Sequence, residues 1–260
     1  MSKKNKLQRF AEMEAFPHVI QADFEEVFQK DYRLKGRWAK DFFGNDKPLV
    51  LELGCGKGEY TVGLARQFPD KNFIGIDIKG ARMHKGAEQA LKEGLKNAAF
   101  VRTRIELIAS FFGKGEVDEL WLTFPDPQMN KTRKRLTSCR FLQLYAGFLK
   151  PGGLLHLKTD SRFLYSYTRE VARHNKLTIV NDYDDLYHSG LEDEILGIRT
   201  YYEERFMAHN LPIKYFSFLL DHPAGLQEPE VDIPRDSYHN AGRSVKLYEN
   251  DQEAPADLRE

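Results

Sequence analysis

A short apolar run, a glycine-rich turn and a helical segment follow one another from residue 49 onward, and this unit limits the possible folds more than any other part of the chain. The run Leu49–Leu53 leads directly into Gly54-Cys55-Gly56-Lys57-Gly58, after which apolar residues recur at helical intervals. Glycine readily adopts left-handed backbone conformations and lets a ligand come close to the main chain. Open α/β sheets bind nucleotides at the carboxyl end of such a strand. The unit therefore predicts an α/β sheet with a nucleotide pocket at one edge.

The same alternation of apolar runs and segments of helical period continues along the chain, which is typical of βαβ units. The expected strands are Leu49–Leu53, Phe73–Asp77, Ala99–Arg102, Glu119–Thr123, Leu154–Thr159, Leu177–Val180 and Ile213–Leu220. The expected helices are Glu59–Phe68, Ala81–Glu93, Ile105–Phe112, Ser138–Leu149 and Arg162–Asn175. The sequence thus predicts a Rossmann-like α/β fold, with a mostly parallel seven-stranded sheet and helices on both faces.

Composition divides the 260 residues into three regions. Residues 1–47 are polar, carry several aromatic side chains and are expected to form a basic, helical flank or lid. Residues 48–220 contain the alternating units and form the main domain. Residues 221–260 hold ten Asp or Glu against four Lys or Arg, and prolines interrupt them. Without sustained periodicity, this last region is expected to be a loosely attached acidic extension.

The chain has no features of a membrane or secreted protein. No stretch approaches the roughly 18 uninterrupted apolar residues of a membrane span, and Met1–Arg9 lacks the apolar core of a secretory signal. Its two cysteines, Cys55 and Cys139, do not have the spacing of a zinc site or redox pair, so both are expected to be reduced. None of the eight histidines forms an H-x-x-x-H pair, so no metal is expected. We expect a cytoplasmic protein; a monomer and a homodimer both remain open.

Positive charge is concentrated in the first 220 residues, although the formal net charge of the whole chain is zero. These residues carry 35 Lys or Arg against 29 Asp or Glu. One cationic cluster lies between Lys3 and Arg9 and another between Lys131 and Arg140. Such clusters favour a polyanionic partner, and the acidic extension could cover them until RNA displaces it. The alternative is that both clusters are ordinary solvated surface.

The glycine turn favours a sulfonium cofactor over a dinucleotide. The dinucleotide fingerprint G-x-G-x-x-G would require glycine at position 59, where this chain has Glu59. Two acids at the mouth of the turn, Glu52 and Glu59, would repel a pyrophosphate but attract the positive charge of S-adenosyl-L-methionine. Asp77 ends the second strand at the separation at which an acid reaches ribose hydroxyls. A helix cap is the alternative role for Asp77, and a dehydrogenase is the least favoured class of enzyme.

A carboxylate stands beside a basic track after the strand that ends at Thr123. The motif Phe124-Pro125-Asp126-Pro127 is followed by eight residues, Gln128 to Arg135, that include four cations and no acid. Base contacts specify a nucleic acid and phosphate contacts position it, so this pairing suits a site in which Asp126 holds a nucleobase. The alternative is a stiff turn before a solvated helix.

Several motifs together resemble the bacterial tRNA (guanine-N7)-methyltransferase family, over roughly residues 48–220. They are Leu51-Glu52-Leu53-Gly54-Cys55-Gly56, Gly75-Ile76-Asp77, Phe124-Pro125-Asp126-Pro127 with Lys134-Arg135 after it, Leu157-Lys158-Thr159-Asp160 and Thr200-Tyr201-Tyr202-Glu203-Glu204-Arg205-Phe206. The resemblance implies a class I methyltransferase fold. It also implies transfer of a methyl group from S-adenosyl-L-methionine to N7 of the variable-loop guanosine of tRNA.

Carried over residue by residue, the resemblance and the glycine turn give a set of cofactor contacts: Glu52, Gly54, Gly56, Gly58, Asp77, Arg104 and Asp126. Where members of the family often carry an acid near the adenine, this chain has Thr103-Arg104. Asp126 is also the expected catalytic residue, at the junction of cofactor and guanine.

The substrate contacts implied in the same way are Asn130, Lys131, Asp160, Thr200 and Glu203, and the RNA contacts are Arg133, Lys134 and Arg135. Gln128 stands where the family often has tryptophan, and Asn130 takes the place of the usual lysine, with Lys131 one position later. For Asp160 the alternative role is the N-cap of the helix that follows it.

Guanine N7 carries a lone pair at neutral pH, so its methylation needs alignment rather than a base that removes a proton. A carboxylate such as Asp126 or Asp160 would stabilise the cationic product. Tyr165, Tyr167, Tyr201 and Tyr202 could stack on a guanosine splayed out of the RNA, or they could simply belong to the core. A methyltransferase acting on another RNA or on a small molecule remains an alternative, as does a non-catalytic RNA-binding protein with a relic pocket.

Overall fold

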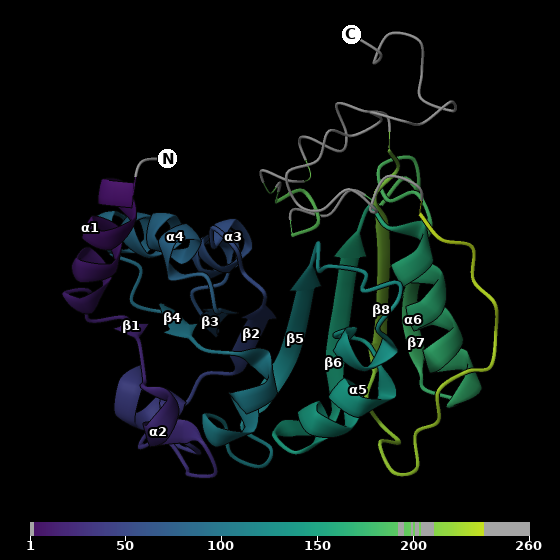
Figure 1. Ribbon diagram of the computed structural model, residues 1–260, viewed down its shortest axis with the longest axis horizontal. Coiled ribbons are helices and arrows are strands. Elements are labelled where there is room, and N and C mark those ends of the chain that lie inside the picture. Colours follow the sequence, from purple (N-terminus) through teal and green to yellow (C-terminus); the bar gives the residue numbers. More distant parts are fainter. Residues whose placement is uncertain (1–2, 192–194, 199, 201–202, 204–210, 237–260) are drawn as a thin grey trace, which may run out of the picture.

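A mostly parallel sheet of eight strands forms the centre of the computed structural model, which describes residues 3–191, 195–198, 200, 203 and 211–236 (Figure 1). From one edge to the other the strands are β1 (Val19–Ile20), β4 (Ala98–Arg102), β3 (Asn72–Asp77), β2 (Leu49–Leu53), β5 (Val117–Thr123), β6 (Leu149–Thr159), β8 (Lys214–Leu219) and β7 (Ile179–Tyr183). Within the described ranges only β8 runs antiparallel to its neighbours, β6 and β7. The predicted α/β fold is confirmed.

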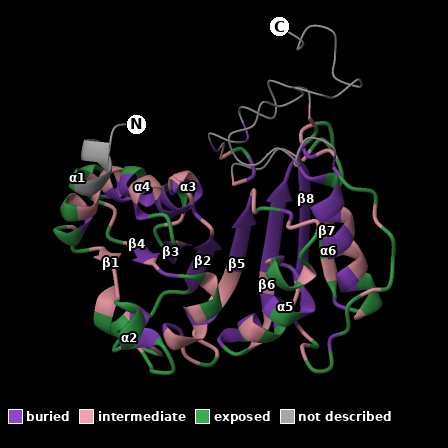
Figure 2. Cartoon of the chain, viewed as in Figure 1, coloured by how far each residue is buried: buried purple, intermediate pink, exposed green. Residues whose placement is uncertain are grey.

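Helices cover both faces of the sheet, because successive residues of each central strand point to opposite sides. Leu51 belongs to a buried cluster with Leu164 of α6 (Arg162–His174), and this cluster also includes residues of α5 (Cys139–Ala146). The next residue back, Val50, belongs to a second cluster with Leu64 of α3 (Glu59–Gln67) and Ala87 of α4 (Gly80–Lys92). Strands that are buried on both faces in this way read as continuous apolar runs. Figure 2 shows these central strands as buried.

The structure corrects several details of the predicted elements. The sheet has eight strands rather than seven, because Val19 and Ile20 pair with Phe100 and Val101 of β4. The last edge strand begins at Ile179 rather than at Leu177. The expected α-helix over Ile105–Phe112 is a 3₁₀-helix over Ile105–Ser110. These differences lie in short or edge elements, where neighbours in space decide the conformation as much as local sequence does.

The region before β2 is packed on the domain. Its helices are α1 (Lys3–Glu14), the single turn α2 (Phe24–Val27) and a π-helical turn, Trp38–Phe42. Glu12 of α1 bonds to His84 of α4, with 2.6 Å between Oε2 and Nε2. Trp38 is fully buried and donates its indole N–H to the carbonyl of Phe111 at 2.7 Å. The part of this flank that the structure describes is therefore continuous with the core.

Residues 221–236 form a strap along α6 and α5 (Figure 1). Glu228 accepts a hydrogen bond from the amide of Cys139 at 2.9 Å, and Leu226 is buried. Gln227 and Asn175 exchange two hydrogen bonds, at 2.8 and 2.9 Å. The expectation of loose attachment is therefore wrong for these residues, and residues 237–260 lie outside the described part. In the described ranges, no helix is both long enough and apolar enough to cross a membrane.

Candidate cofactor and substrate site

The motifs singled out in the sequence meet at one edge of the sheet. β2, β5 and β6 are neighbours and run parallel, so the segments after Leu53, Thr123 and Thr159 leave the sheet on the same side. The chain order reverses between β2 and β5, which is the position where open α/β sheets form a binding crevice. Figure 1 shows the arrowheads of β5 and β6 pointing to this common edge.

Three glycines of the turn after β2 have left-handed backbone conformations. Their φ values are +79° at Gly54, +57° at Gly56 and +73° at Gly58, which side chains other than glycine rarely tolerate. A Cβ atom at Gly58 would lie 2.7 Å from the ring of Phe100. A Cβ atom at Gly54 would meet nothing within 4 Å. The turn is therefore crowded at Gly58 and open at Gly54.

Asp77 holds this glycine turn in shape. One of its carboxylate oxygens accepts the amide of Gly56 at 3.0 Å, and the other accepts the amide of Lys79 at 2.8 Å. Lys79 is the residue immediately before α4, so Asp77 links the turn to the start of that helix. Asp77 lies partly exposed at the end of β3, where its predicted ribose contact remains a prediction.

Glu52 lies beneath the turn and not at its mouth, contrary to the expectation from sequence. It is 3% exposed and accepts hydrogen bonds from the amide and hydroxyl of Thr61, at 2.8 and 2.5 Å, and from the hydroxyl of Thr123 at 2.5 Å. Burial raises the pKa of Glu52 to about 7, against the lowering effect of these three bonds. Its carboxyl group therefore joins β2, α3 and β5 and carries only part of a negative charge at neutral pH.

The loop that carries Asp126 has an unusual backbone on both sides. Phe124 and Gln128 have φ values of +49° and +47°, and both are residues with side chains. Such conformations cost about 1–3 kcal/mol each and cluster at functional sites. The amide of Phe124 donates to the carbonyl of Lys158 at 2.8 Å, and Asp126 accepts the amide of Gln128 at 3.0 Å. The Asp126 side chain is exposed at the common edge.

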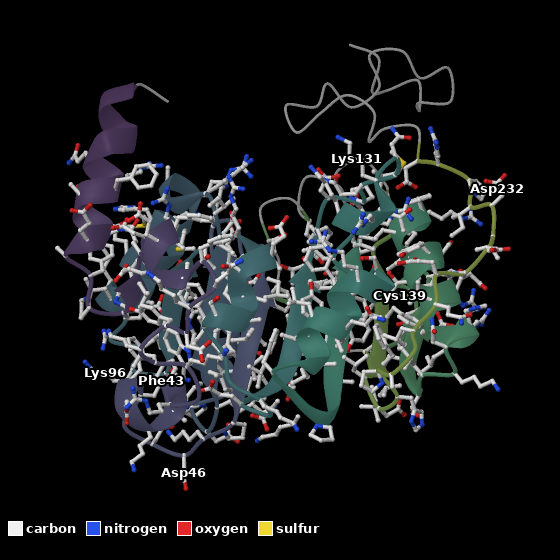
Figure 3. All side chains as sticks on the ribbon, turned by 60° about the horizontal axis from the view of Figure 1, so that its bottom comes forward. Phe43, Asp46, Lys96, Lys131, Cys139 and Asp232 are labelled. Carbon is white, nitrogen blue, oxygen red and sulfur yellow. The ribbon has the colours of Figure 1, made fainter. Side chains whose placement is uncertain are left out.

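The basic track after this loop divides into exposed and buried cations. Asn130, Lys131, Arg133 and Lys134 are exposed around a 3₁₀ turn, Thr132–Lys134 (Lys131 is labelled in Figure 3). Arg135 is only 6% exposed. The prediction that Arg135 contacts RNA phosphates is therefore wrong, because its guanidinium is engaged inside the protein by two aromatic rings and two backbone carbonyls.

Arg135 instead fixes the preceding loop on α6. Its guanidinium carbon lies 4.7 Å from the ring centre of Phe163 and 4.4 Å from that of Tyr167. It donates to the carbonyls of Gln128 at 3.2 Å and Met129 at 2.7 Å. The cation thus holds the end of the Asp126 loop.

Asp160 lies in a buried turn between β6 and α6. It is 4% exposed, and Lys214 donates to its carbonyl oxygen at 3.1 Å. The N-cap of α6 is Ser161, whose hydroxyl oxygen accepts the amide of Leu164 at 2.9 Å. The alternative role of Asp160 as the cap is therefore wrong.

Glu203 forms a fully buried ion pair with Lys158 of β6, with 2.7 Å between Nζ and Oε1. Lys158 also donates to the carbonyl of Leu196 at 2.6 Å. Thr200 is buried, and its hydroxyl accepts the amide of Glu203 at 3.1 Å. Thr200 and Glu203, both predicted to bind the substrate, are therefore buried beside β6. Their direct contact with a substrate remains a prediction.

The candidate stacking tyrosines belong to the core where the structure describes them. Tyr165 and Tyr167 are 5% and 4% exposed, and their hydroxyls donate to Asp182 and Glu228. Tyr201 and Tyr202 lie outside the described residues. Arg104 is exposed immediately before the 3₁₀-helix Ile105–Ser110, in the segment that follows β4, the strand next to β3.

Sequence reasoning did not assign a role to Lys158 by itself. A lysine between Leu157 and Thr159 in a strand that is otherwise apolar is the signal that was available, because buried lysines are almost always paired. Thr61 and Thr123 gave no such signal, since their role depends on the position of Glu52. In the described ranges, no group of three or more potential metal ligands occurs, and Cys55 and Cys139 are both buried and unbridged.

The fold is similar to those of solved methyltransferase structures. A 16S rRNA methyltransferase, KamB, matches with a TM-score of 0.55 and 17% identity, over 74% of this chain and 94% of that one. A structure titled as an antibiotic-related methyltransferase matches with a TM-score of 0.52 and 17% identity, over 73% and 96% of the two chains. At this identity the likeness concerns the fold.

Sequence comparison is more specific. A family model described as "Putative methyltransferase" matches residues 46–215. The tRNA (guanine-N(7)-)-methyltransferase of Bacteroides fragilis is 54% identical over 243 residues, which cover 94% of this chain and 96% of the relative. That of Porphyromonas gingivalis is 56% identical, over 89% and 97% of the two chains. This chain therefore belongs to the tRNA (guanine-N(7)-)-methyltransferase family.

Proposed function

We propose that this protein transfers a methyl group from S-adenosyl-L-methionine to N7 of a guanosine in the variable loop of tRNA. One observation carries the proposal: the open glycine turn after β2 and the loop of Asp126 after β5 leave neighbouring strands at the same edge of the sheet. The exposed cations Lys131, Arg133 and Lys134 follow that loop. Family membership agrees with the same reaction. A tRNA substrate would place the protein in the cytoplasm.

The chain's residues fit the cofactor at the glycine turn. The space above Gly54 would admit it, and Gly56 and Gly58 would keep the backbone close to it. Each oxygen of Asp77 already accepts one backbone amide, and a carboxylate oxygen has capacity for a second bond, such as one from a ribose hydroxyl. Arg104 would lie beside the adenine, and Glu52 would support the turn from below.

Alignment is the main task of the site. When bound, the cofactor supplies a methyl group on a positively charged sulfur, and the N7–carbon bond forms as the carbon–sulfur bond breaks. The lone pair of N7 is already available, so no residue has to remove a proton. Orientation of this kind accounts for about 7–11 kcal/mol of barrier reduction. We assign Asp126 to hold the guanine and stabilise its developing positive charge, with Asp160 supporting the same base.

The RNA would approach along the exposed cations. RNA's major groove is too narrow for a protein pocket, so a guanine attacked at N7 has to be splayed out, as an exposed loop nucleotide can be. Asn130 and Lys131 lie closest to the Asp126 loop in sequence and would contact this nucleotide. Arg133 and Lys134 would contact phosphates. Thr200 and Glu203 would line the guanosine site beside β6, where Glu203 is held by its ion pair with Lys158.

The decisive experiment uses unmodified tRNA and isotopically labelled cofactor. Borohydride and aniline treatment cuts RNA at N7-methylguanosine, so a single cut in the variable loop is the expected result. Label in tRNA without such a cut would mean that another atom or base is methylated. Label that appears only in small molecules, tested as a panel beside the tRNA, would contradict the proposal.

A further inference from the structure

The C-terminal strap, residues 221–236, follows the family-matched region and ends against the turn that carries Asp160. It runs along the outer side of α6 toward the edge where the site lies (Figure 1). Glu228 anchors its middle through the amide of Cys139 and the hydroxyl of Tyr167. The strap's last described residue, Asp236, is 6% exposed although its sequence neighbours Pro234 and Arg235 are exposed.

The carboxylate of Asp236 binds the first turn of α6. One carboxylate oxygen accepts the amide of Phe163 at 3.0 Å, and the other accepts the hydroxyl of Ser161. The oxygen of that hydroxyl in turn accepts the amide of Leu164 at 2.9 Å. A negative charge at this end of a thirteen-residue helix also interacts favourably with the helix dipole. Asp236 therefore fixes both the backbone and the hydroxyl orientation of the first helical turn.

The turn that Asp236 fixes is the one on which Asp160 stands. The amide of Ser161 donates to the hydroxyl of Thr159 at 3.1 Å, so the backbone on both sides of Asp160 is tied. Lys214 of β8 donates to the carbonyl of Asp160 at 3.1 Å, from the side of the sheet. The turn is thus held by β6 and β8 from one side and by the strap from the other.

We propose that Asp236 is a positioning residue for the guanosine site, acting through Ser161 to hold Asp160 at the sheet edge. The inference rests on the proposed function and adds to it a residue beyond the span that the family model matches. Without the carboxylate, Phe163 loses its acceptor and the Ser161 hydroxyl is free to rotate. The alignment of reacting groups is sensitive to shifts of about 1 Å, so a looser turn reduces turnover of bound tRNA.

The test is a double-mutant cycle between Asp236→Ala and Asp160→Ala, measured as kcat/KM for tRNA. We expect Asp236→Ala to lower kcat/KM at least tenfold, while affinity for S-adenosylhomocysteine stays within twofold of wild type. In the Asp160→Ala background, Asp236→Ala is expected to cause no further loss, because the residue through which it acts is already missing. Asp232→Ala is the matched control, since Asp232 is an exposed acid of the same strap (Figure 3).

Two outcomes overturn the inference: kcat/KM unchanged in Asp236→Ala, or the two substitutions multiplying in the double variant. If Asp236→Ala does not fold, Asp236→Asn carries the same cycle, because its amide oxygen still accepts from Phe163 while the charge is lost. Hydrogen exchange at the amides of residues 161–164 gives a readout independent of methyl transfer, and faster exchange in Asp236→Ala than in wild type is expected, because the Phe163 amide has lost its acceptor. Failure of wild type and Asp232→Ala to methylate tRNA would refute the proposed function; unchanged exchange would then refute the positioning role separately.

Discussion

At the residue scale, Asp126 is held in place by an unusual backbone rather than by burial. Phe124 and Gln128, on either side of Pro125-Asp126-Pro127, both have positive φ values. The carboxylate remains exposed in the loop after β5. This strand is the neighbour of β2, which the glycine turn follows, and the basic track comes directly after the loop. A group that is exposed and held at an energetic cost is more consistent with a role in substrate contact than with a role in stability.

We therefore expect Asp126→Ala to lower kcat by about 10²–10³, the magnitude found when one stabilising group is removed from a preorganised site. Affinity for S-adenosylhomocysteine, measured by calorimetry, should change by no more than a few fold. Asp46→Ala is a suitable control, because Asp46 is an exposed acid far from Lys131 in Figure 3. Normal turnover in Asp126→Ala would remove the role assigned to this residue.

Glu52 gives a prediction about pH. Its pKa is about 7 in the folded protein and 4.5 in the unfolded chain, so between these pH values the folded state retains a proton that the unfolded state has released. Stability contributed by this group is therefore greatest below pH 4.5 and falls as the pH rises toward 7. Glu52→Gln cannot release a proton, so its free energy of unfolding should fall less across this interval, by about 3 kcal/mol.

Urea unfolding at a series of pH values would measure this difference. Glutamine can still accept from Thr61 and donate to the hydroxyl of Thr123, so the variant should fold. Glu106→Gln, at an exposed position, should keep the wild-type pH profile. A profile of Glu52→Gln parallel to that of wild type would show that burial does not raise this pKa.

Arg133 and Arg135 are two residues apart but should respond differently to substitution. Arg133→Ala should weaken tRNA binding and reduce the slope of log affinity against log salt by about 1, since an exposed phosphate contact is lost. Arg135→Ala should leave that slope unchanged but lower the melting temperature, because the buried contacts of the guanidinium with Phe163, Tyr167 and both carbonyls are lost. Filter binding at several salt concentrations, with melting curves for each variant, would separate the two roles. A reduced salt slope in Arg135→Ala would restore its predicted phosphate contact.

At the scale of elements, two constraints act on Gly58 in the glycine turn: its backbone conformation and the close packing of its neighbours. Gly58 and Gly94 both have positive φ, +73° and +66°. A Cβ at Gly94 meets nothing within 4 Å, whereas one at Gly58 would lie 2.7 Å from Phe100 and 3.2 Å from Gly86. The turn is therefore pressed against β4 and α4.

Gly58→Ala should displace the turn and lower affinity for S-adenosylhomocysteine by more than tenfold, as measured by calorimetry. Gly94→Ala introduces the same backbone strain, of about 1 kcal/mol, without the collision, and should leave the affinity unchanged. Equal affinities in the two variants would mean that the turn does not contact the cofactor.

At the scale of the whole molecule, the C-terminal region divides at Asp236. Truncation after Leu220 removes Asp236, Glu228 and buried Leu226, and should lower the free energy of unfolding by about 2–4 kcal/mol. Truncation after Asp236 keeps those contacts and should leave the stability unchanged. If the last residues compete with RNA for the basic face, only this shorter truncation raises affinity for any RNA at constant stability. Unchanged binding would exclude such competition.

The sequence alone determined the order and type of the central elements and the motifs of the site. Apolar periodicity placed the strands that end at Leu53, Asp77 and Thr123 correctly, because strands buried on both faces leave a strong local pattern. A two-residue strand such as β1 leaves none, since it exists only through pairing with β4. Residue types also indicated the glycine turn and the loop of Asp126, because special backbone conformations restrict the choice of amino acid.

Only the tertiary structure decided which charged groups face solvent. In the sequence, nothing separates the buried charged residues from less buried ones such as Glu59 and Arg133. The fold buries Glu52 against hydroxyls, Arg135 against aromatic rings and Glu203 against a lysine. The same holds for Asp236, which lies in an acidic stretch but is buried and accepts the amide of Phe163 in the first turn of α6. Burial depends on contacts between residues far apart in sequence, and it determines whether a charge binds a ligand or holds the protein together.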